Sequence, residues 1–507
     1  MKKPMDIKKQ RIIATLCMLA ANTLLFLTLR LLNSYDEVCV GQFLYHAQTS
    51  GEGAGRSAAG ENMLYAFGCG LALTLVGGWL YALLCGQATG LRRRQWYVNY
   101  CAGKVCLFFR RRMLTVAAAV LLFSGVMFLE NTNVLAYVGA MTQESDFIED
   151  NYVDPDTTQL TFPREKRNLI YIYLESMENT FADPNAGEPI TANYIPELTA
   201  LAQENISFSN TNGMGGPLSY EGTTWTAAAL LAQTAGVPIK TPLFEDGFGE
   251  ENQYMPGVTS LGDILHREGY RQVFLLGSNA EFADKEIYFT DHGNYEIIDL
   301  EALKDDGELP DDYKVWWGCE DEKLFTFARE TLTELGKGEE PFNFTMLTVD
   351  THFPDGYVCR LCGDAYEEQY ANVLACSSKQ VYAFVQWIMA QPFYENTTII
   401  LSGDHLTMDP NFLDGLEEEY VRTTYNCIIN AAAKPQQEIN RQFGSFDLFP
   451  TTLGALGVEI EGGRLGLGTD LFSGVPTLTE VYGWEYVDDE LQKPSDFYDE
   501  SILMLGE

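Results

Sequence analysis

Positive charge and histidine are both scarce in this chain. Its 507 residues include 33 Lys and Arg against 71 Asp and Glu, a net charge of −38 at pH 7, and only five His. Because an acidic surface repels the phosphates of nucleic acid, nucleic acid is not expected as a partner. A solvated acidic surface accounts for most of this charge, although the same excess makes a divalent cation a natural companion.

Internal repeats and low-complexity tracts are also missing, which excludes a repeat architecture. No small-residue cleavage site follows the first apolar stretch, so a cleaved signal peptide is not expected. What the sequence does have near its start is three apolar stretches, each long enough for a membrane-spanning helix of about 20 residues. They cover residues 12–29, 63–85 and 114–138, and Glu130 and Asn131 place the end of the third near Leu129.

Basic residues in the short loops set the expected orientation, because cytoplasmic loops carry an excess of Lys and Arg. The amino-terminal tail and the loop between the second and third stretches are rich in them, whereas the loop between the first and second stretches holds only Arg56. We therefore expect the amino terminus inside the cell and everything after about residue 138 outside. The basic residues concerned are Lys2, Lys3, Lys8, Lys9, Arg11, Arg92, Arg93, Arg94, Lys104, Arg110, Arg111 and Arg112.

The chain is expected to have four parts. Residues 1–142 form a membrane anchor with three transmembrane helices, and 143–167 serve as a linker that begins with an acidic stretch. Residues 168–475 form a large extracytoplasmic domain, and 476–507 an acidic C-terminal tail. The expected location is the cell membrane, as a multi-pass protein whose large domain lies in the cell envelope.

Beyond residue 168, short apolar runs alternate with amphipathic segments. The runs cover 168–174, 272–276, 344–348 and 398–401, and the helix-like segments include 261–268, 322–335 and 377–389. Near-continuous apolar strands that alternate with helices indicate an α/β fold, a parallel sheet covered on both faces. In such folds, binding sites collect at the carboxyl ends of the strands.

Ionisable residues follow three of these runs. Glu175 follows the first, Asp350 and His352 the third, and Asp404 and His405 the last. Two carboxylates and an imidazole make a ligand set suited to Mn²⁺, Mg²⁺ or Zn²⁺. A lone carboxylate after a strand is more often a helix cap. Because two of only five His stand shortly after predicted strands, the combination favours a metal site at Glu175, Asp404 and His405.

A hydroxyl-rich turn precedes an apolar helix in the region 221–238. Gly222 marks the turn, Thr223 and Thr224 follow it, and Thr226 stands directly before the helix-forming run 227–232. Such hydroxyls commonly cap helices. A helix amino terminus also favours phosphate, and a Thr hydroxyl there, activated by a metal, would be able to attack phosphorus and form a covalent phospho-enzyme.

Three of the eleven cysteines lie near one another in the extracytoplasmic part: Cys359, Cys362 and Cys376, with Cys319 and Cys427 alone. The Cys-x-x-Cys pair matches half of a zinc site, but no second close pair follows. A disulfide is the expected state outside the cell, and the sequence does not determine which cysteines pair.

Six motifs, in this order, resemble those of the lipoteichoic acid synthase and phosphoglycerol transferase family, in the sulfatase branch of the alkaline-phosphatase superfamily. The sequences of the second and third motifs are most similar to those of the phosphoglycerol transferases that act on periplasmic glucans. The similarity covers roughly residues 145–475 together with the multi-span anchor. The motifs are Asn168-Leu-Ile-Tyr-Ile-Tyr-Leu-Glu-Ser-Met-Glu178, Gly222-Thr-Thr-Trp-Thr-Ala, Leu347-Thr-Val-Asp-Thr-His-Phe-Pro-Asp-Gly356, Ser402-Gly-Asp-His405, Asp447-Leu-Phe-Pro-Thr-Thr-Leu-Gly-Ala-Leu-Gly457 and Gly463-Arg-Leu-Gly-Leu-Gly468.

This resemblance implies an alkaline-phosphatase-like three-layer sandwich with a mostly parallel sheet, and a sulfatase-like catalytic domain at 168–475. It implies that Glu175, Asp404 and His405 bind one divalent metal, with Mn²⁺ favoured over Mg²⁺ or Zn²⁺. The remaining ligand is the nucleophilic Thr, which we assign to Thr226 with Thr223 as the alternative.

The resemblance also implies the substrate-facing residues. His352 matches a family histidine near the substrate phosphate or the leaving oxygen, a general acid, with a structural strand-end histidine as the alternative. Asp350 stands in the same motif and is expected at the substrate. Lipoteichoic acid synthases carry a Trp and an Arg after the strand that corresponds to 272–276. Here Lys285 is expected to replace that cation, more weakly because it lacks the guanidinium fork.

The expected activity is that of a phosphotransferase that moves glycerophosphate from phosphatidylglycerol to a glycan outside the cell. Phosphoethanolamine transfer and phosphodiester hydrolysis use the same residues and stay open. A receptor without activity is disfavoured because every expected ligand is present. The formylglycine-sulfatase signature Cys-x-Pro-Ser-Arg is absent, so hydrolysis of sulfate esters is not expected.

Overall fold

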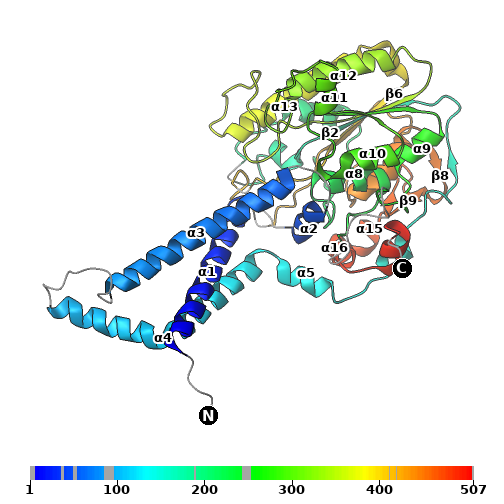
Figure 1. Ribbon diagram of the computed structural model, residues 1–507. Coiled ribbons are helices and arrows are strands. Elements are labelled where there is room, and N and C mark those ends of the chain that lie inside the picture. Colours follow the sequence, from blue (N-terminus) through cyan, green and yellow to red (C-terminus); the bar gives the residue numbers. More distant parts are fainter. Residues whose placement is uncertain are drawn as a thin grey trace. The chain divides into compact units, whose positions relative to one another are not determined.

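The computed structural model describes residues 6–35, 39–48, 54–84, 96–187, 190–241, 253–409, 411–417 and 419–504. The chain divides into two compact units (Figure 1). The first comprises residues 1–40 and 54–138, and the second comprises 41–53 and 139–507.

The first unit is built from three long helices: α1 (Ile7–Leu32), α3 (Ala54–Leu84) and α4 (Trp96–Asn131). Among the described residues, three segments are long and apolar enough to cross a membrane, Ile7–Leu32, Asn62–Ala82 and Arg112–Asn131, as the sequence predicts. Between α1 and α3, the Asn22 amide donates to the Thr74 hydroxyl at 2.9 Å. A Cβ on Gly70 would lie 2.7 Å from the Thr23 nitrogen, so the missing side chain lets these two helices approach closely.

The second unit is organised around a sheet of six strands within the described part of the chain, in the order β4-β3-β5-β2-β6-β7. The first five are parallel, and β7 runs antiparallel at the edge. The strands are β2 (Asn168–Leu174), β3 (Arg271–Leu276), β4 (Glu296–Ile298), β5 (Phe342–Leu347), β6 (Thr397–Gly403) and β7 (Asn426–Ile429). The α/β architecture predicted from the sequence is therefore confirmed.

Helices cover both faces of this sheet, because its central strands are apolar on both sides (Figure 1). On one face, Ile172 and Phe344 join a core with α7, α12 and α13. On the other face, Tyr171 donates to Gln233 at 2.9 Å, and the rings of Phe274 and Phe289 lie 4.1 Å apart. The covering helices are α7 (Pro196–Glu204), α8 (Thr226–Ala235), α9 (Leu261–Arg267), α10 (Lys285–Asp291), α11 (Leu300–Asp305), α12 (Asp321–Leu335), α13 (Gln369–Met389) and α14 (Leu448–Ala455).

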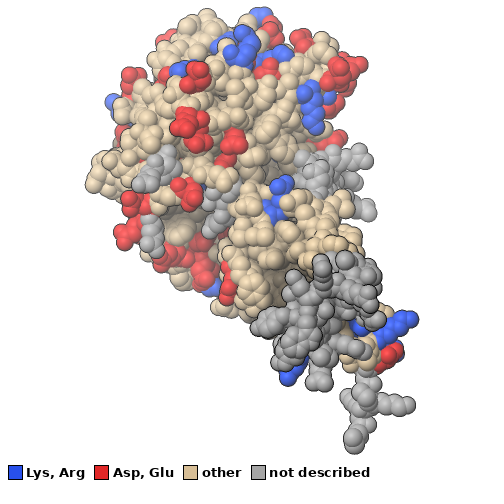
Figure 2. Space-filling view, turned by 90° about the vertical axis from the view of Figure 1, so that its left-hand side faces the viewer, with Lys and Arg blue, Asp and Glu red and all other residues tan. Residues whose placement is uncertain are grey.

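Segments at the ends of the chain complete this unit. α15 (Leu478–Tyr482), α16 (Trp484–Gln492) and a single turn at Tyr498–Ile502 occupy the region expected as an acidic C-terminal tail. Buried Tyr498 donates to the Pro238 carbonyl at 2.6 Å, and Val487 and Leu491 are buried. Acidic side chains are spread over the visible face of the second unit, which is the expected catalytic unit (Figure 2). The other short elements are α2 (Val40–Gln48), α5 (Val134–Ala140), α6 (Phe147–Asn151), β1 (Leu160–Thr161), β8 (Glu459–Ile460), β9 (Arg464–Leu465) and β10 (Gly468–Thr469).

Candidate active site and metal centre

The register of two central strands brings two carboxylates together. In the parallel pair of β2 and β6, Leu174 lies opposite Gly403, so Glu175 and Asp404 leave the sheet at the same level. Ser176 then turns the chain with a φ of 52°, a left-handed conformation that is costly for a residue with a side chain. The Ser176 N–H donates to Asp404 Oδ1 at 2.8 Å. The turn thus fixes one carboxylate oxygen and leaves the other to face the site.

Glu175, Asp404 and His405 form a buried group whose ligand atoms all lie within 4.8 Å of one another. His405 Nε2 is 3.6 Å from Glu175 Oε1 and 3.5 Å from Asp404 Oδ2. The structure therefore brings together the three residues that the sequence predicts as metal ligands.

Three features of this group fit a divalent cation. Asp404 Oδ2 is buried and has no hydrogen-bond partner in the described part of the chain, although a buried oxygen of this kind normally has one. His405 Nδ1 lies 2.7 Å from the Leu406 carbonyl. It can bond that oxygen only as an N–H donor, which in the neutral ring leaves the Nε2 lone pair directed at the carboxylates. Two carboxylate oxygens and one imidazole nitrogen suit Mn²⁺ or Zn²⁺ in particular.

The electrostatics of Glu175, Asp404 and His405 also favour a bound cation. Burial raises the pKa of Asp404 to about 7, and the neighbouring Glu175 carboxylate adds to the shift. Burial alone would lower the pKa of His405, but the carboxylates of Asp404 and Glu175 outweigh it and raise that pKa. Like charges in a dry site repel each other, and a cation bound among them would relieve this repulsion.

Helix α8 begins at Thr226, as its alanine-rich run predicts. The Thr226 hydroxyl lies 3.3 Å from His405 Nε2 and 3.4 Å from Glu175 Oε2. The preceding Trp225 is extended and buried, and its Nε1 has no partner in the described part of the chain. Thr226 is therefore the first residue of the helix, and it lies beside the candidate metal ligands Glu175 and His405, which together with Asp404 are called the metal-type ligands here.

Thr223 is placed differently. It is buried, and its hydroxyl donates to the Tyr220 carbonyl at 2.8 Å and accepts from the Tyr220 N–H at 3.0 Å. Gly222 beside it has a φ of 79°, and a Cβ there would lie 2.5 Å from the Ile239 carbonyl oxygen. The Thr223 hydroxyl thus closes a tight turn and is engaged on both sides.

His352 lies on the loop after β5, with its ring 4.7 Å from that of Trp317. Its Nδ1 lies 2.7 Å from the Phe353 carbonyl, which directs Nε2 elsewhere. Desolvation of the half-buried ring lowers the pKa of His352 to about 4, and His405 and Lys285 contribute to this lowering. The ring is therefore neutral at neutral pH and lies within electrostatic range of the metal-type ligands.

Lys285 begins α10 and is buried. Its ammonium donates to the Phe282 carbonyl at 2.5 Å and lies 4.9 Å from the centre of the Phe282 ring. Burial lowers the pKa of Lys285 to about 8, although Glu175 opposes the shift. The structure thus holds a buried cation within electrostatic range of Glu175.

Asp350 turns towards α12. Its Oδ1 accepts from the Asp321 N–H at 3.1 Å, and Asp321 Oδ1 in return accepts from the Val349 N–H at 2.8 Å. The described contacts therefore place the Asp350 carboxylate at the amino terminus of α12.

Helix α2 was not predicted from the sequence, and its residues from Gly41 onward belong to the catalytic unit. Fully buried Tyr45 donates to the Ala283 carbonyl at 2.8 Å, and its ring lies 5.8 Å from that of Trp225. His46 stacks on Phe282 with the ring centres 5.4 Å apart. The sequence did contain a signal for this helix. His46, one of the five histidines, lies in an amphipathic stretch between two predicted spans.

The ion pair behind the metal-type ligands was also missed. Glu178 is fully buried, and Arg422 donates to its two carboxylate oxygens at 3.1 and 2.8 Å. Glu178 also accepts from the Thr407 N–H at 3.0 Å. The pair ties the loop after β2 to the segment that follows β6. In the sequence, the available sign of this ion pair was the position of Glu178 at the end of the first motif.

Comparison with known proteins identifies the family of this chain. A family model described as Sulfatase matches residues 167–458. Phosphoglycerol transferase I of Escherichia fergusonii is 32% identical over 330 residues, which cover 64% of this chain and 41% of that protein. Phosphoglycerol transferase I of an Escherichia coli strain is 32% identical over 329 residues, with the same two shares. The match thus spans about two fifths of the length of these curated relatives.

Solved structures support the fold alone. A protein of the alkaline phosphatase superfamily from Vibrio parahaemolyticus has a TM-score of 0.50 at 21% identity, covering 66% of this chain and 79% of that one. The lipoteichoic acid synthase LtaP from Listeria monocytogenes has a TM-score of 0.50 at 16% identity, covering 65% of this chain and 82% of that one. The sheet and its covering helices are therefore alkaline-phosphatase-like.

Proposed function

This chain belongs to the sulfatase family of the alkaline-phosphatase superfamily, and on that premise we propose that it transfers glycerophosphate from phosphatidylglycerol to a glycan hydroxyl outside the cell. The reaction proceeds through a covalent intermediate on Thr226. The homology to phosphoglycerol transferase I supports this choice of head group.

One observation carries the proposal. The Thr226 hydroxyl stands at the first position of α8, 3.3 Å from His405 Nε2 and 3.4 Å from Glu175 Oε2. A nucleophile at a helix amino terminus has backbone N–H groups beside it that favour a phosphate. Thr223 does not compete for this role, because its hydroxyl is held by Tyr220 on both sides.

Glu175, Asp404, His405 and Thr226 would hold the divalent metal, which we assign as Mn²⁺ with Mg²⁺ or Zn²⁺ as alternatives. When bound, it would polarise the phosphate and lower the pKa of the Thr226 hydroxyl. The buried ammonium of Lys285 adds a positive charge that complements the phosphate. Asp350 stays a proposed substrate residue: its Oδ1 accepts from the Asp321 N–H, and its buried Oδ2 has no hydrogen-bond partner in the described part of the chain.

The two chemical steps balance in atoms and protons. In the first, Thr226 Oγ1 forms a bond to phosphorus, the bond from phosphorus to the diacylglycerol oxygen breaks, and that oxygen gains a proton while Thr226 loses one. In the second, the glycan oxygen bonds to phosphorus and loses its proton, the bond from phosphorus to Thr226 Oγ1 breaks, and Thr226 regains a proton. His352 serves the leaving oxygen as acid and the glycan hydroxyl as base. Its pKa of about 4 rises when the anionic lipid head group binds beside it.

The membrane spans fit this donor. Phosphatidylglycerol lies in the membrane that the three predicted spans would cross. The basic tail and second loop place the amino terminus in the cytoplasm, and the catalytic unit then meets the outer leaflet.

The test is to incubate the purified full chain in detergent with head-group-labelled phosphatidylglycerol and Mn²⁺. We expect release of diacylglycerol and a glycerophosphate adduct on Thr226, identified by mass spectrometry, and neither product from Thr226→Val. If the protein is labelled only when the lipid is phosphatidylethanolamine, that lipid and not phosphatidylglycerol is the donor. Turnover without a protein adduct would replace the covalent intermediate with direct attack by the acceptor.

A further inference from the structure

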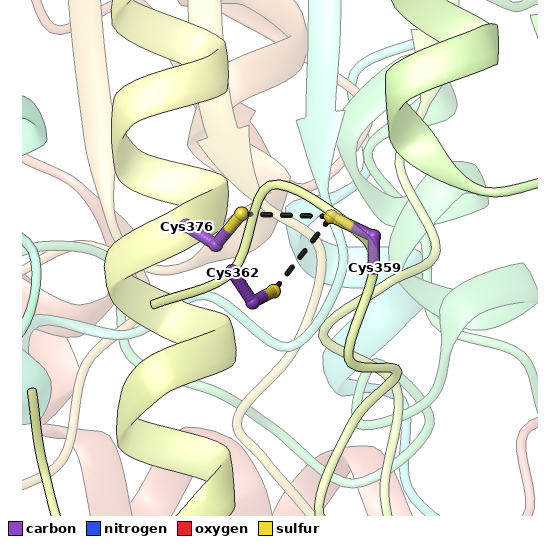
Figure 3. A group of neighbouring side chains, drawn as sticks. All are labelled: Cys359, Cys362 and Cys376. Carbon is purple, nitrogen blue, oxygen red and sulfur yellow. Dashed lines mark hydrogen bonds between the residues drawn. The ribbon is translucent and has the colours of Figure 1, made fainter. Parts of the chain in front are cut away.

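Three cysteine thiols converge at a second place in the catalytic unit, apart from the metal-type ligands of the active site. Cys359 and Cys362 lie on the loop between β5 and α13, and Cys376 lies on α13 itself (Figure 3). Cys359 Sγ is 3.7 Å from Cys362 Sγ and 3.6 Å from Cys376 Sγ. All three sulfurs lie within 4.8 Å of one another. We propose that these three cysteines bind one Zn²⁺ ion, with solvent as the fourth ligand.

The spacing of the sulfurs fits a metal better than a disulfide. Bonds of about 2.3 Å at tetrahedral angles separate two sulfurs on one Zn²⁺ by about 3.8 Å, close to the distances of 3.6 and 3.7 Å in the structure. A disulfide requires about 2.0 Å between two sulfurs and would leave the third thiol in contact with the bond. The three thiols therefore form a ligand set, and each would give up its proton to solvent on binding the metal.

The surroundings of the cluster suit a cation. The Gln380 amide, one turn after Cys376 on α13, lies 3.5 Å from Cys376 Sγ and 3.9 Å from Cys359 Sγ. An amide that donates to these sulfurs would stabilise the thiolates.

The cluster has access to solvent on one side. Cys359 and Cys376 are buried, whereas Cys362 is half-buried. The backbone N–H of Cys362 bonds the Cys359 carbonyl at 3.1 Å, which closes the Cys-x-x-Cys turn. An ion would thus be able to enter past Cys362, and a water molecule would complete the tetrahedron.

Zinc at this position would fasten the loop that carries His352. That loop is tied at its start, where the Thr351 hydroxyl donates to the Glu175 carbonyl at 2.6 Å. The thiols tie its later part to α13. The ion would therefore position His352 without touching the substrate. The zinc site itself rests on the thiol geometry and is independent of the proposed transfer reaction.

The test measures zinc in the full chain, purified in detergent with a reductant and without chelator. His405→Ala serves as the background, so that the active site does not contribute metal. We expect about one zinc per chain in this background by elemental analysis, and loss of that zinc in Cys362→Ser and in Cys376→Ser. Cys427→Ala is the matched control, because Cys427 is a buried cysteine of β7 outside the cluster, and it should keep the zinc.

A second measurement does not depend on how the variants fold. Co²⁺ added to the zinc-free His405→Ala chain should give thiolate-to-metal charge-transfer absorption, and Zn²⁺ should protect the three cysteines from alkylation. Either of two results overturns the proposal. One is an unreduced protein with a disulfide among these cysteines and no zinc, and the other is three reactive thiols that Zn²⁺ does not protect.

Discussion

Replacing Thr226 and Thr223 by Val, one at a time, separates two hydroxyls that lie three residues apart in the chain. Val keeps the shape of Thr and has a methyl group in place of the hydroxyl. The Thr226 hydroxyl has long contacts of 3.3 and 3.4 Å with His405 and Glu175, whereas the Thr223 hydroxyl makes two short bonds with Tyr220, at 2.8 and 3.0 Å. The first hydroxyl is placed for chemistry and the second for holding a turn.

The magnitudes follow from these contacts. Thr226→Val should lower the rate of diacylglycerol release by roughly 10⁴-fold or more, as expected for the loss of a covalent nucleophile. It should change the free energy of unfolding by no more than about 0.5 kcal/mol. Thr223→Val removes two buried hydrogen bonds of about 1 kcal/mol each, so it should destabilise the protein by about 2 kcal/mol. Its activity per folded molecule should stay within a few-fold of wild type.

The assay pairs denaturant unfolding in detergent with lipid turnover measured on the same preparations. The opposite pattern, with activity lost in Thr223→Val and kept in Thr226→Val, would refute the assignment of the nucleophile. Loss of both activity and stability in Thr226→Val would show that its hydroxyl has a structural role that the described contacts do not reveal.

Three further outcomes follow from other buried groups. Asp404→Asn should abolish the rise in unfolding temperature that Mn²⁺ gives the wild type by binding the folded state, and an equal rise in the variant would contradict the ligand assignment. Arg422→Met should destabilise the protein by about 3–5 kcal/mol, because Glu178 stays buried without its partner, and Glu178→Gln in the same chain should restore part of the loss. Burial and the Asp321 charge raise the pKa of Asp350 above its ordinary value of 3.8, so its contribution to stability is fully present below that ordinary value and is lost as the pH rises through the raised pKa. Unfolding free energies measured across that range should fall less in Asp350→Asn, and equal slopes would remove Asp350 as the source.

The central strands and the start of α8 were predictable because their signals are local. β6 is buried along its whole length, and β2 is buried except at its first residue, Asn168. A continuous apolar sequence of this kind predicts a central strand. The alanine-rich run after Thr226 has a high helix propensity, and Gly222 with a φ of 79° marks the turn before it. Because parallel strands end at one edge, placing Glu175 and Asp404 after their strands was enough to predict that they meet.

The side-chain directions around the site had no such signal. Asp350 and His352 follow the same strand, yet Asp350 bonds the start of α12 while His352 packs against Trp317. Ala283 and Asp284 both adopt positive φ, at 58° and 55°, before Lys285, although neither is glycine. This turn decides where the Lys285 ammonium points, and nothing in the local sequence favours it. Tertiary packing therefore determines the direction of each of these side chains.

Helix α2 shows why a boundary drawn from hydropathy can be misleading. The predicted anchor ran without interruption from residue 1 to 142, because apolar spans flank the loop on both sides. Yet Tyr45 is fully buried within the catalytic unit, bonds the Ala283 carbonyl at 2.8 Å and packs on Trp225, the residue before Thr226. These partners lie 180 or more residues further along the chain, so no window of sequence around Tyr45 contains them. A catalytic unit cut at the predicted boundary would lose the side chain that covers Trp225, and with it one support for the helix start that carries the nucleophile.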